Sequence, residues 1–110
     1  MSLQQKIINL LTICRRAGKT VIGFDAVCGE IKNGNVFCVL TASDISAKTK
    51  KEVEFYCGKS AVPIAETPIS KEAYGLYLGK QTAVTAICDK GFADKFICLL
   101  YTSPSPRDLS

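Results

Sequence analysis

The segment RRAGKT at residues 15–20 ends in Gly-Lys-Thr, the triplet that also ends a nucleotide-binding phosphate loop. A phosphate loop has the pattern G-x-x-x-x-G-K-S/T between a strand and a helix, so that backbone N–H groups converge on the phosphates. Here Ile13 stands in the place of the first glycine, and a helical pattern rather than a strand precedes Gly18. The segment is therefore predicted to end a helix at Gly18, with Lys19 in solvent, and not to bind a nucleotide.

Few other residues of the chain could catalyse a reaction. Histidine is absent, which excludes Ser-His-Asp triads, Cys-His pairs and histidine-based zinc sites. The carboxylate pairs Glu52/Glu54 and Asp89/Asp94 are predicted to lie on a charged helix face and beside a turn, rather than to act as acid and base. Cys14 lies on the apolar stripe of the first predicted helix, so its thiol is predicted to be buried rather than reactive. We therefore expect no enzyme activity, metal, cofactor or small-molecule substrate.

The surface that follows the first helical segment has a composition suited to a polyanion. The first four charged residues of the chain are all basic, and this asymmetry favours a negatively charged partner. Gly23-Phe24-Asp25 then opens a second helical segment. Helix N-terminal N–H groups, a glycine that permits close approach and an aromatic ring are suited to a phosphate and an unstacked base. An alternative fits the residues equally well: Gly23 only forms the turn and Phe24 packs in the core.

Hydrophobic spacing predicts an alternation of helices and strands around these residues. The predicted helices are residues 3–17, 24–32, 47–57, 71–79 and 92–100, and the predicted strands are residues 36–42, 62–66 and 82–88. Ser46 is expected to cap the third helix and Gly58 to end it. In the fourth helix, Ala73, Leu76 and Tyr77 are the candidates for burial. This order indicates an α/β protein, a three-layer α/β/α sandwich with a small parallel or mixed sheet.

The length of 110 residues fits one domain. No apolar run is long enough to cross a bilayer, and the N-terminal segment lacks the apolar core of a signal peptide, so we expect a cytoplasmic protein with no membrane partner. The six cysteines form no C-x-x-C pair, and they are expected to be buried, reduced side chains. Residues 101–110, YTSPSPRDLS, lack periodic apolar residues and look like a translated adapter sequence. The predicted domain is therefore residues 1–100, followed by a non-native or disordered tail.

Three long stretches resemble a known family: LLTICRRAGKTVIGFDAV, IKNGNVFCVLTASDISAKTKKEVEFYC and VPIAETPISKEAYGLYLGKQTAVTAICDKGFA. The most specific elements are A-G-K with Gly23 close behind, ASDIS with TKK after a buried strand, LGK before another strand, and DKGFA near the end. In their order and spacing these elements resemble the kink-turn RNA-binding ribosomal protein family, in particular its bacterial YlxQ-like branch. The resemblance covers about residues 3 to 99.

The resemblance implies a three-layer α/β/α sandwich that binds structured RNA without catalysis, typically a sharply bent helix with an internal loop. The implied partner is ribosomal RNA, with ribosomal proteins as further partners. The residues that the resemblance and the surface analysis place at the RNA are Lys19, Gly23, Phe24, Asp25, Lys32, Lys80, Gln81 and Thr82. The lysines would hold phosphates, Gly23 would allow close approach, Asp25 would face base edges, and the last two residues would flank an extruded nucleotide.

The contact loop departs from the pattern of these relatives, which reads Gly-x-Asn-Glu and then Thr-Lys three residues on. Gly23 matches, but Asp25 takes the place of the asparagine, Ala26 of the glutamate, Cys28 of the threonine and Gly29 of the lysine. The missing lysine removes a phosphate contact, and Asp25 adds negative charge near phosphates. These replacements favour an alternative function, a protein-interaction module of the same fold that acts in ribosome or translation-factor assembly without specific RNA recognition.

Overall fold

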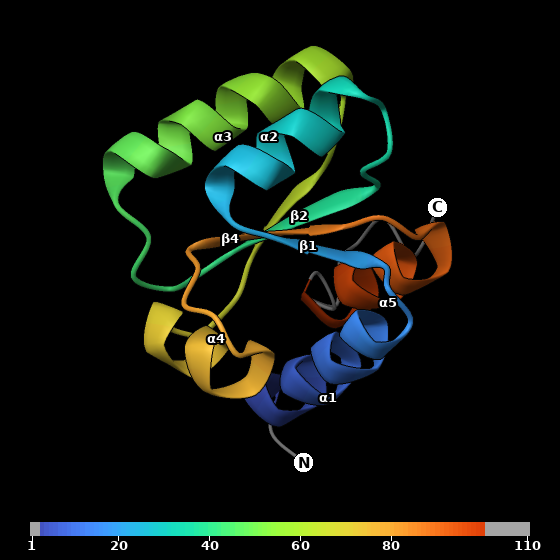
Figure 1. Cartoon of the computed structure of the whole chain (residues 1–110), viewed down its shortest axis with the longest axis vertical. Coiled ribbons are helices and arrows are strands. Elements are labelled where there is room, and N and C mark those ends of the chain that lie inside the picture. Colours follow the sequence, from blue (N-terminus) through green and yellow to red (C-terminus); the bar gives the residue numbers. More distant parts are fainter. Residues whose placement is uncertain (1–2, 101–110) are drawn as a thin grey trace, which may run out of the picture.

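The computed structural model describes residues 3–100, over which helices and strands alternate. The elements are α1 (Leu3–Arg16), β1 (Thr20–Ile22), α2 (Phe24–Lys32), β2 (Cys38–Thr41), α3 (Ala47–Ser60), β3 (Ile64–Glu66), α4 (Lys71–Leu78), β4 (Val84–Ile87) and α5 (Lys90–Leu100). In Figure 1, α2 and α3 cover one face of the sheet, and α1, α4 and α5 cover the other. The predicted three-layer α/β/α sandwich is confirmed. The predicted tail, residues 101–110, lies outside the described residues.

The sheet is mixed, with the strand order β1-β4-β2-β3. β4 lies between β1 and β2 and runs antiparallel to both, whereas β2 and β3 are parallel. Residues 20–22 were not predicted as a strand, because three residues are too few to show an alternating pattern. Their strand conformation depends on pairing with β4, in which Thr20 lies opposite Ile87 and Ile22 opposite Thr85.

The sheet separates two hydrophobic cores. Side chains alternate along a strand, so Val84 and Ala86 of β4 join Val27 and Val53 under α2 and α3. Ile87 of β4 instead joins the core beneath α1, α4 and α5. All residues of β2 and β4 are buried, which explains why both strands read as continuous apolar or β-branched runs.

The buried face of α4 differs from the predicted one. Leu76 is 77% exposed and Tyr77 is 45% exposed, whereas Tyr74 and Leu78 are each 1% exposed. The reason is a polar contact: the Tyr74 hydroxyl lies 2.9 Å from Thr67 Oγ1, which also bonds to the Thr41 carbonyl at the end of β2. Tyr74 thus anchors α4 to the sheet, and the prediction for Leu76 and Tyr77 is wrong.

Two helix boundaries also differ from the predictions. α3 continues through Gly58 to Ser60 and ends at Ala61 in the left-handed conformation, although Ser46 caps its start as predicted. α5 begins at Lys90 rather than at residue 92, because the Asp89 carboxylate accepts the Phe92 N–H at 3.0 Å and so holds the first turn. The end of α1 is confirmed, since Gly18 follows it with a φ of 73°.

Cysteine burial follows the prediction for four side chains: Cys14, Cys28, Cys38 and Cys57. Cys88 is half-buried, and Cys98 is exposed on α5, so the prediction is wrong for Cys98. All of these thiols are free. None of the helices within residues 3–100 is both long and apolar enough to span a membrane.

Tyr74→Phe is expected to lower the free energy of unfolding by about 1 kcal/mol, because it removes a buried hydrogen bond and keeps the ring. Urea titration followed by circular dichroism measures the change. Tyr77→Phe changes an exposed ring on the same helix and should leave the stability unaltered. Equal effects of the two substitutions would contradict the anchoring role of Tyr74.

The same variant also tests how stability depends on pH. Burial raises the pKa of Tyr74 to about 12, while its hydrogen bond with Thr67 acts in the opposite direction. An unfolded tyrosine titrates near pH ~10, so the stabilising contribution of Tyr74 is complete below that pH and is lost as the pH rises through the folded pKa. The Tyr74→Phe protein should therefore lose less stability over this alkaline range than the unmodified protein does.

Candidate functional site

The loop between α4 and β4 lies near two other segments of the chain, the start of α2 and the last turn of α1. A Cβ atom placed on Gly23 would lie 4.0 Å from Lys80 Nζ, and one placed on Gly79 would lie 3.7 Å from a guanidinium nitrogen of Arg15. The Gly23 N–H also donates to the Val84 carbonyl at 3.3 Å. We call Arg15, Gly23, Gly79 and Lys80 the Gly23 corner.

The start of α2 leaves backbone donors without a side-chain cap. Gly23 is the N-cap residue, and no side chain hydrogen-bonds to the first turn. Its φ of 102° and ψ of 142° lie in a region that residues with a side chain rarely adopt, so glycine is required here. The first-turn N–H groups and the helix dipole favour an anion at this end. The exposed carboxylate of Asp25, in the same turn, opposes this preference.

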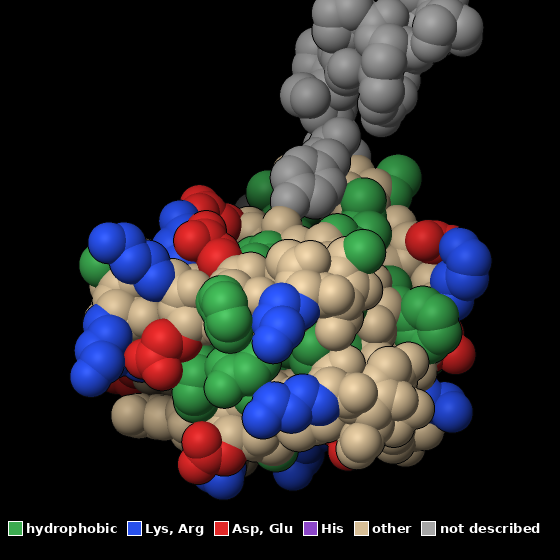
Figure 2. Space-filling view, turned by 90° about the horizontal axis from the view of Figure 1, so that it is seen from above, with side chains coloured by type: hydrophobic (Ala, Val, Ile, Leu, Met, Phe, Trp, Pro, Cys, Tyr) green, Lys and Arg blue, Asp and Glu red, His purple; other side chains and the backbone are tan. Residues whose placement is uncertain are grey.

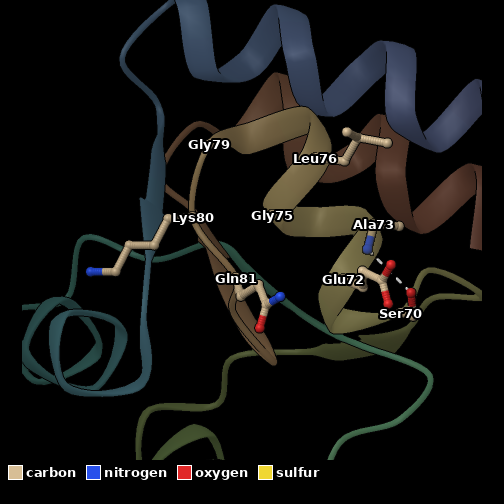
Figure 3. A pocket seen from close by; sticks show the side chains of 8 residues that line it. All are labelled: Ser70, Glu72, Ala73, Gly75, Leu76, Gly79, Lys80 and Gln81. Carbon is tan, nitrogen blue, oxygen red and sulfur yellow. Dashed lines mark hydrogen bonds between the residues drawn. The ribbon is translucent and has the colours of Figure 1, made fainter.

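The loop from α4 to β4 lies directly against α4. A Cβ atom on Gly75 would come within 2.7 Å of Gln81 Cγ and 3.3 Å of the Gln81 backbone nitrogen, so only glycine allows this contact. The helix and the loop border a hollow of about 600 Å³. Figure 3 shows Gln81 beside the hollow, whereas the Lys80 side chain points away from it and across β1. Lys80 is thereby directed towards Gly23.

The structure brings part of the predicted site together. Gly23 and Lys80 are neighbours, and Asp25 and Gln81 are exposed on the same two segments. Phe24 is half-buried and packs against the core beneath α2 and α3, as the alternative interpretation of that residue predicts. Its ring is thus partly withdrawn from solvent.

Thr82 does not present its side chain to solvent. It is 6% exposed, and its hydroxyl donates to the Val84 carbonyl at 2.6 Å while accepting the Val84 N–H at 3.2 Å. The hydroxyl thus holds the backbone at the start of β4, and its hydrogen is already used in this bond. The predicted contact between the Thr82 side chain and an extruded nucleotide is corrected accordingly.

Lys19 and Lys32 lie at the other end of the same elements. The Lys19 carbonyl accepts the Cys88 N–H at 2.8 Å, beyond the far end of β4. Four residue steps of about 3.3 Å separate Lys19 from Gly23 along β1, or roughly 13 Å. Lys32 is the last residue of α2, and its ammonium lies 5.1 Å from the Tyr56 ring centroid. Neither lysine belongs to the Gly23 corner.

Two residues of this region were not predicted as site residues. Arg15 lies in the basic end of α1, and its proximity to Gly79 is visible only in three dimensions. Gly75 gave a sequence signal, because a glycine in the interior of a helix destabilises it and indicates a close contact. The contact is the one with Gln81 described above.

Two features of the described residues bear on reactivity, the Cys14 thiol and the grouping of possible metal ligands. Burial raises the pKa of the Cys14 thiol, so this side chain is not poised as a nucleophilic thiolate despite its basic neighbours. Within residues 3–100, no three His, Cys, Asp or Glu side chains come together in a way that would hold a metal ion. The features that remain at the Gly23 corner are positive charge, exposed backbone donors and a glycine.

Comparison with known sequences gives a family and two curated relatives. Residues 5–97 match the ribosomal protein L7Ae/L30e/S12e/Gadd45 family. The RNA-binding protein YlxQ of Bacillus subtilis (strain 168) is 39% identical over 92 residues, which cover 83% of this chain and 91% of that protein. The RNA-binding protein YlxQ of Enterococcus faecium is 35% identical over 92 residues, covering 84% of this chain and 88% of that protein.

Solved structures share the same architecture. A protein of unknown function from Bacillus halodurans C superposes with a TM-score of 0.79 at 28% identity, over 86% of this chain and 95% of that one. The Giardia lamblia 15.5kD RNA binding protein superposes with a TM-score of 0.74, over 91% of this chain and 88% of that one. Its identity is 18%, so this likeness concerns the fold alone. The match over residues 5–97 and the two curated relatives establish that the chain belongs to the ribosomal protein L7Ae/L30e/S12e/Gadd45 family.

Proposed function

We propose that this protein is a non-catalytic, cytoplasmic, ribosome-associated RNA-binding protein that recognises structured RNA with a kink-turn-like bend or a loop. The family and the two relatives named RNA-binding protein YlxQ support RNA as the ligand. The observation that carries the proposal is the Gly23 corner, where an uncapped helix N-terminus lies beside Lys80 and Arg15 lies against the neighbouring Gly79.

The groups of the corner have complementary roles in this proposal. Gly23 has no side chain, so the RNA can approach the start of α2 closely. Lys80 and Arg15 contact phosphates on either side, and they supply affinity with little sequence preference. The Asp25 carboxylate accepts hydrogen bonds from base amino groups, and Gln81 lies next to an extruded nucleotide.

A bent or looped RNA suits this surface better than a regular duplex. An A-form helix hides its major groove, and its bases become accessible mainly at bulges, loops and ends. A small basic corner with one glycine can therefore recognise where the backbone bends and a base is exposed. Lys19 and Lys32 are too far from Gly23 to contact the same phosphates, and in this proposal they contact phosphates farther along the RNA.

Titration of three RNAs tests the proposal: a kink-turn, a straight duplex of equal length and a single strand, each at several salt concentrations. We expect the bent RNA to bind most tightly, with a log–log salt slope that corresponds to a few phosphates. Fluorescence anisotropy measures the dissociation constants. Equal, weak binding of all three RNAs would exclude recognition of a bend.

Lys80→Gln and Arg15→Gln should each weaken binding of the bent RNA several-fold and reduce its salt slope by about one. Lys51→Gln, at an exposed lysine of α3, removes the same charge from another face and is the matched control. Gly23 is a poorer probe, because any side chain at a φ of 102° strains the fold itself. If the control weakens binding as much as the two variants do, net charge rather than the corner binds the RNA.

Asp25→Asn is expected to tighten RNA binding, because it removes a negative charge near phosphates and keeps an amide oxygen as an acceptor. The gain should be largest at low salt, where the repulsion is least screened. Glu54→Gln on α3 neutralises an exposed carboxylate away from the corner and should leave the affinity unchanged. A loss of affinity in Asp25→Asn would instead show that RNA binding requires the carboxylate.

A further inference from the structure

Residues of α1 and α5 line an apolar groove. These two helices belong to the layer opposite α2 and α3 (Figure 1). The apolar lining of the groove consists of Leu10, Ile13, Cys98 and Leu99, Asn9 also lines it, and its volume is about 440 Å³. Ile13 is 54% exposed, and Cys98 is also exposed. The proposed RNA contacts use none of these side chains.

Lysines lie on both sides of the groove. Lys6 lines it from α1 and Lys95 from α5. α1 contains no acidic residue, and the acidic residue of α5, Asp94, pairs with Lys90 at 3.3 Å. The groove is therefore lined mainly by apolar side chains, with one lysine from each helix and no acidic residue.

The two helices that line the groove carry the excess positive charge of the domain, of which Lys6 and Lys95 lie at the groove and Arg15 lies at Gly79. α1 and α5 together contain five basic residues and one acidic residue, whereas the other described residues contain eight of each sign. The net charge of +4 thus arises entirely from these two helices, since residues 101–110 contribute one charge of each sign. By contrast, the face over α2 and α3 shows basic and acidic side chains interspersed around hydrophobic ones (Figure 2).

We propose that this groove docks an acidic amphipathic helix of a partner protein. Such a helix places apolar side chains at i, i+3 or i+4, and i+7 on one stripe, which fits a groove between two helices. Its flanking carboxylates would face Lys6 and Lys95. Electrostatic complementarity of this kind selects the partner and speeds association.

Other occupants match the groove less well. A second copy of this chain would bring Lys6 and Lys95 of both molecules together, and like charges at an interface are unfavourable. RNA would meet a lining that lacks an aromatic side chain on which a base could stack. A membrane is bound by an apolar helix face that is buried at the headgroup boundary, whereas these apolar side chains line a hollow between two helices. These occupants are the alternative outcomes of the test.

The test uses the full chain and a synthetic acidic helix of about 18 residues, with a leucine stripe flanked by glutamates. Its counterpart with lysine in place of each glutamate is the second probe. We expect that only the acidic peptide binds and that its affinity falls as the salt concentration rises. Its NMR chemical-shift changes should be confined to α1 and α5. The acidic peptide should also slow alkylation of the Cys98 thiol by iodoacetamide, because it covers that side chain.

Ile13→Glu and Lys95→Glu should each lower the affinity for the acidic peptide at least tenfold. Phe55→Glu and Lys51→Glu likewise replace one apolar and one basic side chain by glutamate, at exposed positions of α3, and should have no effect. Ile13→Leu should preserve binding, and thermal unfolding shows whether each variant is folded.

The proposal is overturned if both peptides bind equally, if the shift changes lie outside α1 and α5, or if the α3 variants weaken binding as much. Self-association of the free chain through Ile13, or binding to phosphatidylserine–phosphatidylcholine vesicles without binding of the acidic peptide, would also overturn it. Kink-turn RNA affinity of Ile13→Glu is measured alongside. Ile13→Glu should lose binding of the acidic peptide and keep its RNA affinity. In the unmodified protein, failure to bind the acidic peptide with RNA binding intact refutes only the groove, and peptide binding without a preference for the bent RNA refutes only the proposed RNA function.

Discussion

The antiparallel pairing of β4 with β1 is the interaction on which the rest of the structure depends. β4 also pairs with β2, and its four residues are buried on both faces of the sheet. The pairing sets Gly23 opposite the start of β4, where the Gly23 N–H bonds to the Val84 carbonyl. Because the α4–β4 loop immediately precedes Val84, the same register brings Lys80 to the start of α2. A change in this register would separate the residues of the Gly23 corner.

The layers could be predicted from the sequence because their cause is local. Continuous apolar runs bounded by turns indicate strands covered on both faces, and the amphipathic segments between them indicate the covering helices. The buried face of α4 could not be predicted in this way. Its apolar residues Tyr74, Leu76, Tyr77 and Leu78 occupy more than one side of an eight-residue helix, so periodicity leaves the choice open. A hydrogen bond to a residue outside the helix determines which side is buried: Thr67 Oγ1 bonds to the Tyr74 hydroxyl and also to the Thr41 carbonyl.

The candidate site was predictable in residue type but not in arrangement. Glycine before a helix and lysine after a helix-ending glycine are local signals, and both residues lie at the Gly23 corner. Their contact arises from strand order, which one sequence does not reveal. Thr82 shows the converse limit: a polar residue in a connection suggests solvent, yet its hydroxyl satisfies the backbone at the entry to β4. Lys19 and Lys32 were grouped with the site by charge, although the lengths of β1 and α2 place them at the opposite end.

The two proposed surfaces share α1 and differ in the side of that helix they use. Ile13 and Arg15 are two residues apart, so they point in directions about 200° apart around the helix axis. Arg15 therefore approaches α4 at Gly79, while Ile13 faces the groove with α5. An RNA and an acidic helix could then be bound at once without a steric conflict. Both ligands are negatively charged, however, and they would approach the same basic helix. Binding of either ligand would therefore lower the affinity for the other by the same factor, and salt would reduce this effect.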